Sequence, residues 1–202
     1  MSTSKNRIVK TQSEKWFEHY CAKVGLTSKR IPEGIGKTPD YELTIDGQCV
    51  IAEVKEITRN PKECESDKLL YARGYGNVLS HTPGDRVRQK IADSSHQIKA
   101  RTQGKYSSIL ILCELHQIGG HLDPYNIRVA MYGLEQVHIA VPGDRSVRPY
   151  ATGMSFGPKR KMTKNANTSI SAIGVLFWPN ASEITLNVYT TNMQRCRSIR
   201  PC

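Results

Sequence analysis

The sequence lacks the features of a membrane-spanning or secreted protein. No apolar run in its 202 residues approaches the roughly 18 that a transmembrane helix needs. The N-terminal stretch MSTSKNRIVK is polar and has no apolar core segment, so we expect no secretory signal peptide. The six cysteines are scattered and form no CxxC pair, which argues against a structural zinc site and a disulfide scaffold. We therefore expect a cytoplasmic protein with no membrane partner.

Several catalytic motifs are missing as well. The histidines show no HxH or HExxH spacing, so a zinc hydrolase is not expected. His116 and His121 lie near Asp123 and form only a weak alternative metal site. A P-loop is absent, which excludes an ATP motor within this chain, and no GxSxG elbow is present.

The charge balance points to a polyanionic partner. The chain has 29 Lys and Arg against 18 Asp and Glu, a formal net charge of +11. A basic surface concentrates polyanions, and nucleic acid is the partner that we expect. The length and the 38% hydrophobic fraction suit one domain, residues 1–202, with a single core.

Residues 12–24 are predicted to form a helix. Thr11 and Glu14 have the spacing of a capping box, and Gly25 stands at the expected C-cap. Glu14 lies at the edge of the apolar face, whereas Glu18 lies farther toward solvent. Apolar residues recur there with the helical period: Trp16, Phe17, Tyr20, Cys21 and Val24.

A β-hairpin is predicted next. Residues 41–45 and 48–57 read as strands, and the Asp46-Gly47 pair between them is a strong two-residue turn signal. Side chains alternate along a strand, which places on one face Cys49, Ile51, Glu53 and Lys55.

The remaining chain gives weaker signals. Residues 59–84 show little periodicity and are predicted to be a long irregular excursion. Residues 85–101 are predicted to form a basic helix, and residues 107–114 a buried strand. The second half is interpreted as a strand or short helix at 126–132, a strand at 134–141, a polar loop at 149–167, and strands at 170–177 and 184–189.

One constellation in the hairpin carries chemistry. Asp40 follows Pro39 at the start of one strand, and Glu53 and Lys55 lie near the end of its partner, so the three can converge. Two neighbouring carboxylates favour a hard divalent cation, with Asp40, Glu53 and the Val54 carbonyl as ligands for Mg²⁺. Such an ion polarises a phosphodiester and activates water, while Lys55 stabilises the developing charge.

This P-D followed by E-x-K pattern resembles the PD-(D/E)xK nuclease superfamily. The order helix, hairpin, helix, strand over about residues 11–114 is similar to the core of that family. The resemblance implies an α/β restriction-endonuclease-like fold, a central mixed β-sheet flanked by helices, with residues 115–202 as an extension that adds C-terminal strands. It also implies that Glu14, or Glu18 in its place, completes the metal site, and that Gln97 faces the active site.

The expected function is metal-dependent hydrolysis of DNA phosphodiester bonds, with Mg²⁺ as cofactor and Mn²⁺ as substitute. A nuclease for RNA or branched nucleic acid, and a non-catalytic nucleic-acid-binding module of the same fold, remain alternatives. Cutting both strands usually needs two active sites, so a homodimer is a reasonable hypothesis. Phosphate contacts supply most non-specific affinity, and the residues expected to make them are Arg86, Arg88, Lys90, Lys159, Arg160 and Lys161.

Overall fold

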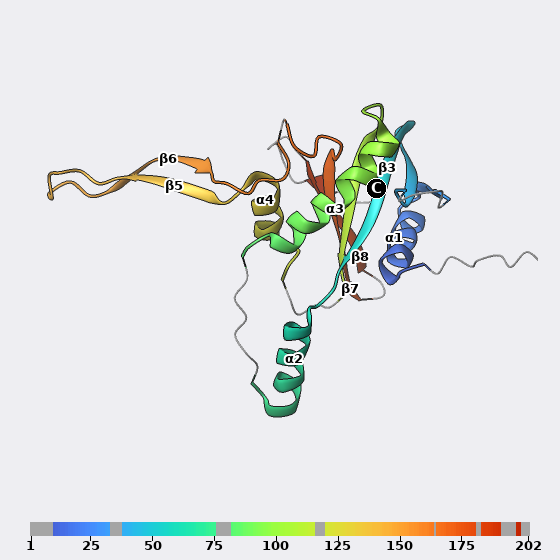
Figure 1. Ribbon diagram of the computed structural model, residues 1–202, viewed down its shortest axis with the longest axis horizontal. Coiled ribbons are helices and arrows are strands. Elements are labelled where there is room, and N and C mark those ends of the chain that lie inside the picture. Colours follow the sequence, from blue (N-terminus) through green and yellow to red (C-terminus); the bar gives the residue numbers. More distant parts are fainter. Residues whose placement is uncertain are drawn as a thin grey trace, which may run out of the picture.

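A computed structural model describes residues 10–32, 38–75, 82–115, 120–163, 165–180, 183–190 and 197–198. Within these residues the chain forms an α/β fold with a central mixed sheet flanked by helices (Figure 1). None of the helices so described is long and apolar enough to cross a membrane.

The central sheet has seven strands among the described residues, in the order β1-β2-β3-β4-β7-β8-β9. Pairing is parallel between β3 and β4 and between β4 and β7, and antiparallel elsewhere in this sheet. The strands are β1 (Thr27–Arg30), β2 (Tyr41–Ile45), β3 (Gln48–Ile57), β4 (Ser107–Glu114), β7 (Ala172–Asn180), β8 (Glu183–Thr190) and β9 (Arg197–Ser198).

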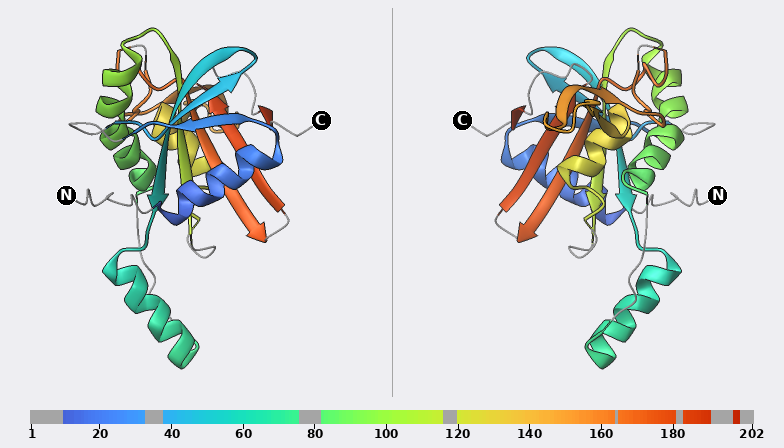
Figure 2. Two further views of the ribbon diagram at one scale, coloured as in Figure 1. Left: turned by 90° about the vertical axis from the view of Figure 1, so that its right-hand side faces the viewer. Right: turned by 90° about the vertical axis from the view of Figure 1, so that its left-hand side faces the viewer.

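Alternating residues of the central strand β4 supply both layers of the core. Ile109 and Ile111 join a cluster with Phe17 of helix α1 (Gln12–Lys23) on one face. Leu110 and Leu112 join a second cluster with helices α3 (Asp85–Thr102) and α4 (Pro124–Tyr132) on the other face. Burial on both faces explains why this strand is a continuous apolar run. Figure 2 shows α1 and α3 on opposite sides of the sheet.

The predicted hairpin is confirmed. Strands β2 and β3 pair antiparallel, with Ile45 opposite Gln48. Asp46 and Gly47 have φ values of 49° and 76°, the left-handed pair that a two-residue type I′ turn requires. The helices at the start of the chain and at 85–101 and the late strands β7 and β8 are confirmed too.

The interpretation of residues 59–84 as an irregular excursion is wrong for residues 61–73, which form helix α2 (Pro61–Arg73). Asn60 caps this helix in a capping box with Glu63, and Pro61 stands in its first turn. Only Ser66 is buried along it, so the helix has no apolar stripe for a pattern to detect. In Figure 1 it extends away from the sheet. Residues 76–81 lie outside the described residues.

Three strands were not predicted, one of which is the two-residue β9 at the edge of the central sheet. Strand β1 lies in the basic segment after α1 and pairs with β2, with Arg30 opposite Tyr41. Strand β6 (Tyr150–Phe156) lies within the expected loop at 149–167 and pairs with β5 (Glu135–Ala140), the strand predicted at 134–141. The choice left open at 126–132 falls to the helix α4, whose N-cap is Asp123.

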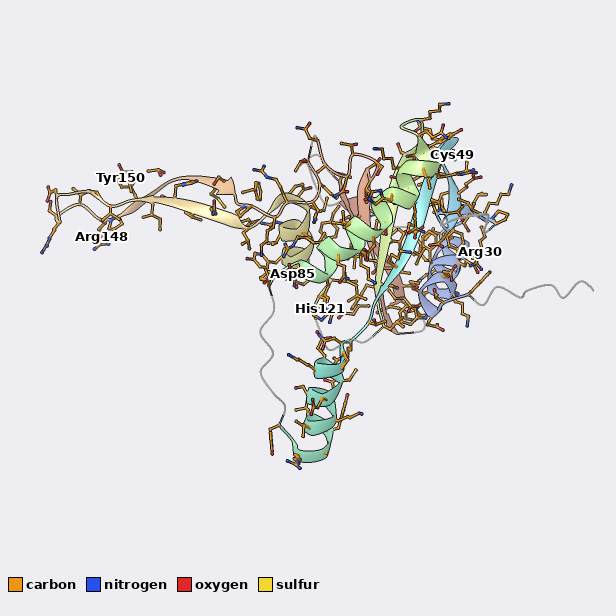
Figure 3. The ribbon with its side chains drawn as sticks, in the orientation of Figure 1. Arg30, Cys49, Asp85, His121, Arg148 and Tyr150 are labelled. Atoms are coloured by element: carbon orange, nitrogen blue, oxygen red, sulfur yellow. The ribbon has the colours of Figure 1, made fainter. Side chains whose placement is uncertain are left out.

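Strands β5 and β6 form a separate two-stranded antiparallel ribbon. It projects from the body at the end of α4, as Figure 1 shows in yellow and orange. Figure 3 places Arg148 and Tyr150 toward its far end, remote from Arg30 in the body. The predicted C-terminal extension therefore both widens the central sheet and forms this ribbon.

Candidate active site

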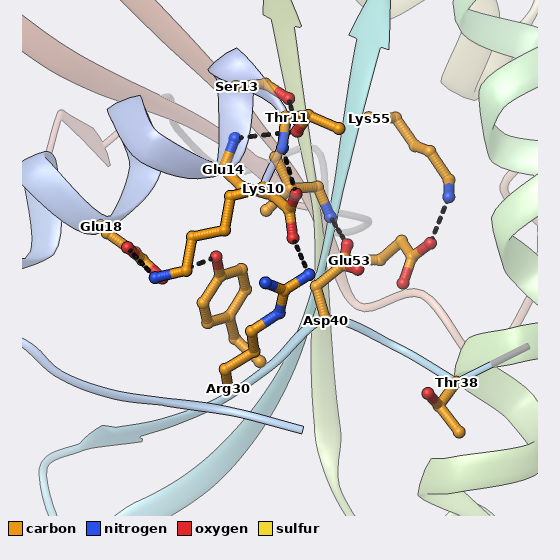
Figure 4. A network of polar contacts seen from close by, with 12 residues as sticks. Lys10, Thr11, Ser13, Glu14, Glu18, Arg30, Thr38, Asp40, Glu53 and Lys55 are labelled. Atoms are coloured by element: carbon orange, nitrogen blue, oxygen red, sulfur yellow. Dashed lines mark hydrogen bonds and ion pairs between the residues drawn. The ribbon is translucent and has the colours of Figure 1, made fainter. Parts of the chain in front are cut away.

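The hairpin brings Asp40 and Glu53 together. Asp40 immediately precedes β2, and its neighbour Tyr41 pairs with Ala52 of β3. The Asp40 Oδ2 atom accepts a hydrogen bond of 2.8 Å from the Val54 backbone N–H. This bond fixes the carboxylate beside the strand position that carries Glu53, as Figure 4 shows.

The Glu53 carboxylate is fully buried, with 0% of the residue exposed. The groups that favour its ionised form are few: the Lys55 side chain and the Asp40 backbone. The nearest counter-charge is the ammonium of Lys55, whose Nζ lies 2.5 Å from Oε1. Burying a carboxylate with so few partners is unfavourable for its ionised form.

The raised pKa values of both carboxyl groups reflect this unfavourable burial. Burial, followed by the negative charge of Asp40, raises the pKa of Glu53 to about 7, although Lys55 opposes the shift. Burial also raises the pKa of Asp40, against the opposing effects of the Val54 N–H and Lys55. Two adjoining carboxyl groups therefore both resist ionisation, and a bound cation would relieve that resistance.

Lys55 connects this pair to open space. Its side chain is 28% exposed and lines a cleft of about 740 Å³ between β3 and α3. The cleft is open and its wall carries both charge signs, so it suits a polar ligand better than an apolar one. The residues contributed by α3 are Lys90, Ala92, Asp93, His96 and Gln97.

Glu14 lies near the carboxylate pair but is held by other groups. Its Oε2 accepts from the Thr11 backbone N–H at 2.6 Å, which completes the predicted capping box. Its Oε1 lies 2.8 Å from Nη2 of Arg30. Its charge contributes to raising the pKa of Asp40, so it belongs to the same electrostatic neighbourhood. Both oxygens are engaged, which favours a structural role.

Glu18 points to a different set of partners. Its oxygens lie 2.6 and 2.7 Å from Nζ of Lys10, and Oε1 accepts from the Tyr41 hydroxyl at 3.0 Å. Glu18 was expected to lie toward solvent, but in the structure it is half-buried and paired with Lys10 and Tyr41. These contacts make Glu18 a poor substitute for Glu14 in the site.

Arg30 is the neighbour that the sequence did not single out. It stands on β1 and reaches Glu14, as Figure 4 shows. Its positive charge partly opposes the rise in the pKa of Asp40 that burial causes. A short basic segment gives no signal of this role, because the pairing of β1 with β2 is what brings the guanidinium to the site.

Gln97, which the resemblance implies to face the active site, stands on helix α3. It lines the cleft beside Lys55, and its Nε2 is 3.5 Å from the Thr38 carbonyl oxygen, a long hydrogen bond. It therefore comes to the entrance of the site without touching Asp40 or Glu53 in any described contact.

The six cationic residues expected to contact phosphate occupy different places. Lys90 lines the cleft. Arg88 is only 5% exposed and donates to the Pro83 carbonyl and to Asp85, so burial removes it from any phosphate surface. Arg86 is engaged by the Glu63 carboxylate and the Thr58 carbonyl. Lys159 and Arg160 are exposed and Lys161 half-buried, in the segment after β6.

The alternative metal site is not formed by the described residues. His116 lies outside them, Asp123 caps α4, and His121 faces Glu63 at 3.4 Å. More generally, the described chain contains no group of three or more His, Cys, Asp or Glu side chains that could hold a metal ion.

The donors at Asp40 and Glu53 nevertheless fit a hard cation. They supply two carboxylates, of which that of Glu53 is fully buried and paired with the Lys55 ammonium. The Val54 carbonyl follows Glu53 on strand β3. Mg²⁺ is usually held by one or two carboxylates and keeps several waters, so it does not need a cage of three side chains.

Comparison of the chain with protein-family models, curated proteins and solved structures gave no match.

The pKa of Glu53 predicts an unusual pH dependence of stability. The folded pKa of about 7 lies above the ordinary 4.5, so the folded protein binds a proton that the unfolded chain releases. Without divalent cations, protonation of Glu53 contributes to the free energy of unfolding, on the order of 3 kcal/mol. The contribution is fully present below pH 4.5 and is lost as the pH rises through 7. Glu53→Gln should therefore be more stable than the wild type at pH 8 in EDTA, as measured by urea unfolding.

The matched control is Glu65→Gln on α2, where the glutamate is exposed and the substitution should leave stability unchanged at both pH 5 and pH 8. A Glu53→Gln protein that is less stable than the wild type at pH 8 would contradict the proposed strain.

The contacts of Glu14 predict that Glu14→Gln lowers stability and spares catalysis. A neutral amide weakens both the capping box and the pairing with Arg30, with an expected loss of about 1 to 2 kcal/mol. Thermal unfolding and the Mg²⁺ dependence of activity separate this role from metal binding. A Mg²⁺ requirement raised more than about tenfold, with unchanged stability, would assign Glu14 to the metal instead.

Proposed function

We propose that this protein is a Mg²⁺-dependent nuclease that hydrolyses DNA phosphodiester bonds, with a restriction-endonuclease-like core of the PD-(D/E)xK type. The observation that carries the proposal is the strained carboxylate pair, Asp40 and Glu53, with Lys55 reaching from it into an open cleft. A buried carboxylate with a strongly raised pKa in a cleft is a common mark of a functional site.

The order of elements supports the same fold. Helix α1, the β2–β3 hairpin, helix α3 and strand β4 follow one another as the resemblance implies, apart from the added helix α2. The parallel pairing of β3 with β4 puts Glu53 opposite Leu110 in the middle of the sheet. The two helices cover opposite faces there, so the active residues stand on rigid elements.

In this proposal Asp40, Glu53 and the Val54 carbonyl hold the metal. A bound Mg²⁺ would polarise the phosphodiester and lower the pKa of its water. Val54 also fixes Asp40 through its N–H, so one residue of β3 both orients the carboxylate and offers a carbonyl. With a cation compensating the charge of Glu53, the Lys55 ammonium would be available to hold the attacking water and to stabilise charge at the phosphate.

The cleft supplies the substrate contacts. Lys90 adds a positive charge beside Lys55, and Gln97 adds an amide at the entrance. The exposed Lys159 and Arg160 add positive charge on the segment after β6, and the net charge of +11 favours a polyanion over the whole molecule. DNA is the proposed substrate, and RNA and branched nucleic acid are tested beside it.

The cysteines fit a reducing compartment, which we propose to be the cytoplasm. Within the described chain, Cys21, Cys49, Cys64 and Cys113 are all free thiols. Proteins of oxidising compartments commonly pair such residues.

The proposal predicts that Lys55→Ala lowers the cleavage rate by about 100-fold or more, because the transition state loses its positioned cation. The assay compares linear, circular, single-stranded and branched DNA and RNA, with Mg²⁺, Mn²⁺ or EDTA. EDTA should abolish cleavage by the wild type, and Mn²⁺ should restore it.

Lys68→Ala is the matched control, since this lysine is exposed on α2, and it should cleave like the wild type. If the wild type cleaves RNA faster than DNA, the proposed substrate changes but the proposed roles of Asp40, Glu53 and Lys55 do not. Tight DNA binding with no cleavage under either metal, or equal activity of Lys55→Ala, would favour the non-catalytic binding module.

A further inference from the structure

The β5–β6 ribbon exposes an unusual amount of apolar surface. Six of the twelve large hydrophobic side chains exposed among the described residues belong to it and its connecting turn. Their exposures reach 70% and 76% at Met154 and Val141. The six are Val137, Ile139, Val141, Val147, Tyr150 and Met154. Contiguous patches of this kind mark interaction sites on soluble proteins.

The register places three of these six side chains, Val137, Ile139 and Met154, on one side of the ribbon. Val137 pairs with Met154, and Ile139 pairs with Ala151, so these four side chains share one face. We call it the apolar face. The opposite face carries Gln136, His138, Ser155 and Tyr150. On that side, His138 Nε2 lies 2.7 Å from Ser155 Oγ.

The ribbon is held only at its base. Phe156 packs on Tyr132 with ring centroids 5.8 Å apart, and the Gly157 N–H donates to the Leu134 carbonyl at 2.6 Å. Beyond that base, the described residues place no other element against the apolar face (Figure 1). A lone two-stranded ribbon is marginally stable in water, so an ordered ribbon of this composition needs a partner.

The charge pattern identifies the kind of partner. Residues 136–143 and 149–158 contain no Asp, Glu, Lys or Arg, although the chain as a whole carries 23% charged residues and a net charge of +11. A neutral apolar surface offers nothing to a phosphate backbone. When two copies of this basic chain meet there, no like charges come into direct contact.

The open edges of the two ribbon strands are a second feature that favours pairing with a second copy. Both strands of the ribbon pair only with each other, so each has an open edge. Natural edge strands are usually protected by lysine, proline, a bulge or a covering element. Strands β5 and β6 contain no lysine or proline, and their pairing has one register shift, between His138 and Ile139. An identical ribbon is complementary to both the open edge and the apolar face.

We propose that the β5–β6 ribbon is a homodimerisation arm that packs its apolar face against the same face of a second copy. Such an interface is isologous, with Val137 and Ile139 of each ribbon covering the equivalent side chains of the other. The charged tip residues Asp144, Arg145 and Arg148 stay at the rim in solvent. This proposal does not depend on the nuclease activity.

The test is sedimentation velocity over a concentration series with the double variant Ile139→Lys/Met154→Lys. The wild type should sediment as a dimer, and the variant should associate roughly 100-fold more weakly, since charge is introduced at the buried centre of the contact. The matched controls are Gln136→Lys, on the opposite face of the same strand, and Tyr71→Lys, an exposed aromatic on α2. Both should remain dimeric.

Amide hydrogen exchange supplies a readout that needs no variant. Exchange at residues 136–141 and 150–156 should slow as the wild-type concentration rises, while exchange in α2 stays constant. A wild type that is monomeric at about 100 μM, with concentration-independent exchange, overturns the proposal. So does loss of dimerisation in Gln136→Lys alone, or a monomeric wild type whose ribbon binds neutral lipid vesicles or DNA in the same exchange experiment.

Discussion

The burial of the Glu53 carboxylate is the constraint on which the rest of the site depends. It lies on a central strand with no exposed surface, beside a second carboxyl group that shares its resistance to ionisation. Sheets normally fill such a position with an apolar side chain, as Leu110 does on the neighbouring strand. Keeping a glutamate there costs folding free energy, and a cation bound at the proposed site would offset that cost.

The groups around this carboxylate divide into two sets. Arg30 and the capping of α1 hold Glu14, so that side of the neighbourhood is closed and structural. Lys55 is the partner that opens onto the cleft, between Glu53 and the polar wall of α3. The first set lies beside Asp40, whose carboxylate is itself held by the Val54 N–H, and the second opens the pair onto the cleft. The β5–β6 ribbon, the proposed homodimerisation arm, lies apart from this site.

The hairpin and the closeness of Asp40, Glu53 and Lys55 could be predicted because the signals are local. A turn pair and a two-residue alternation decide both the register and the shared face of Glu53 and Lys55. Arg30, the burial of Arg88 and helix α2 could not be predicted, because each depends on tertiary contacts. Arg88 lies on a basic helix, and its sequence does not reveal which of the basic residues are buried. The burial of Arg88 depends on its contacts with the Pro83 carbonyl and Asp85. The ribbon was half predicted, since β6 has no buried face to set a pattern.

The most direct test of the carboxylate pair is calorimetric titration of the protein with Mg²⁺ at pH 6.5, in buffers of different ionisation heat. We expect one site per chain and release of roughly half a proton or more per ion, because Glu53 is largely protonated before the metal binds. Glu53→Gln should abolish both the binding and the proton release. Binding that is unchanged in Glu53→Gln, or the absence of binding by the wild type, would contradict the assignment of Asp40 and Glu53 as a metal site.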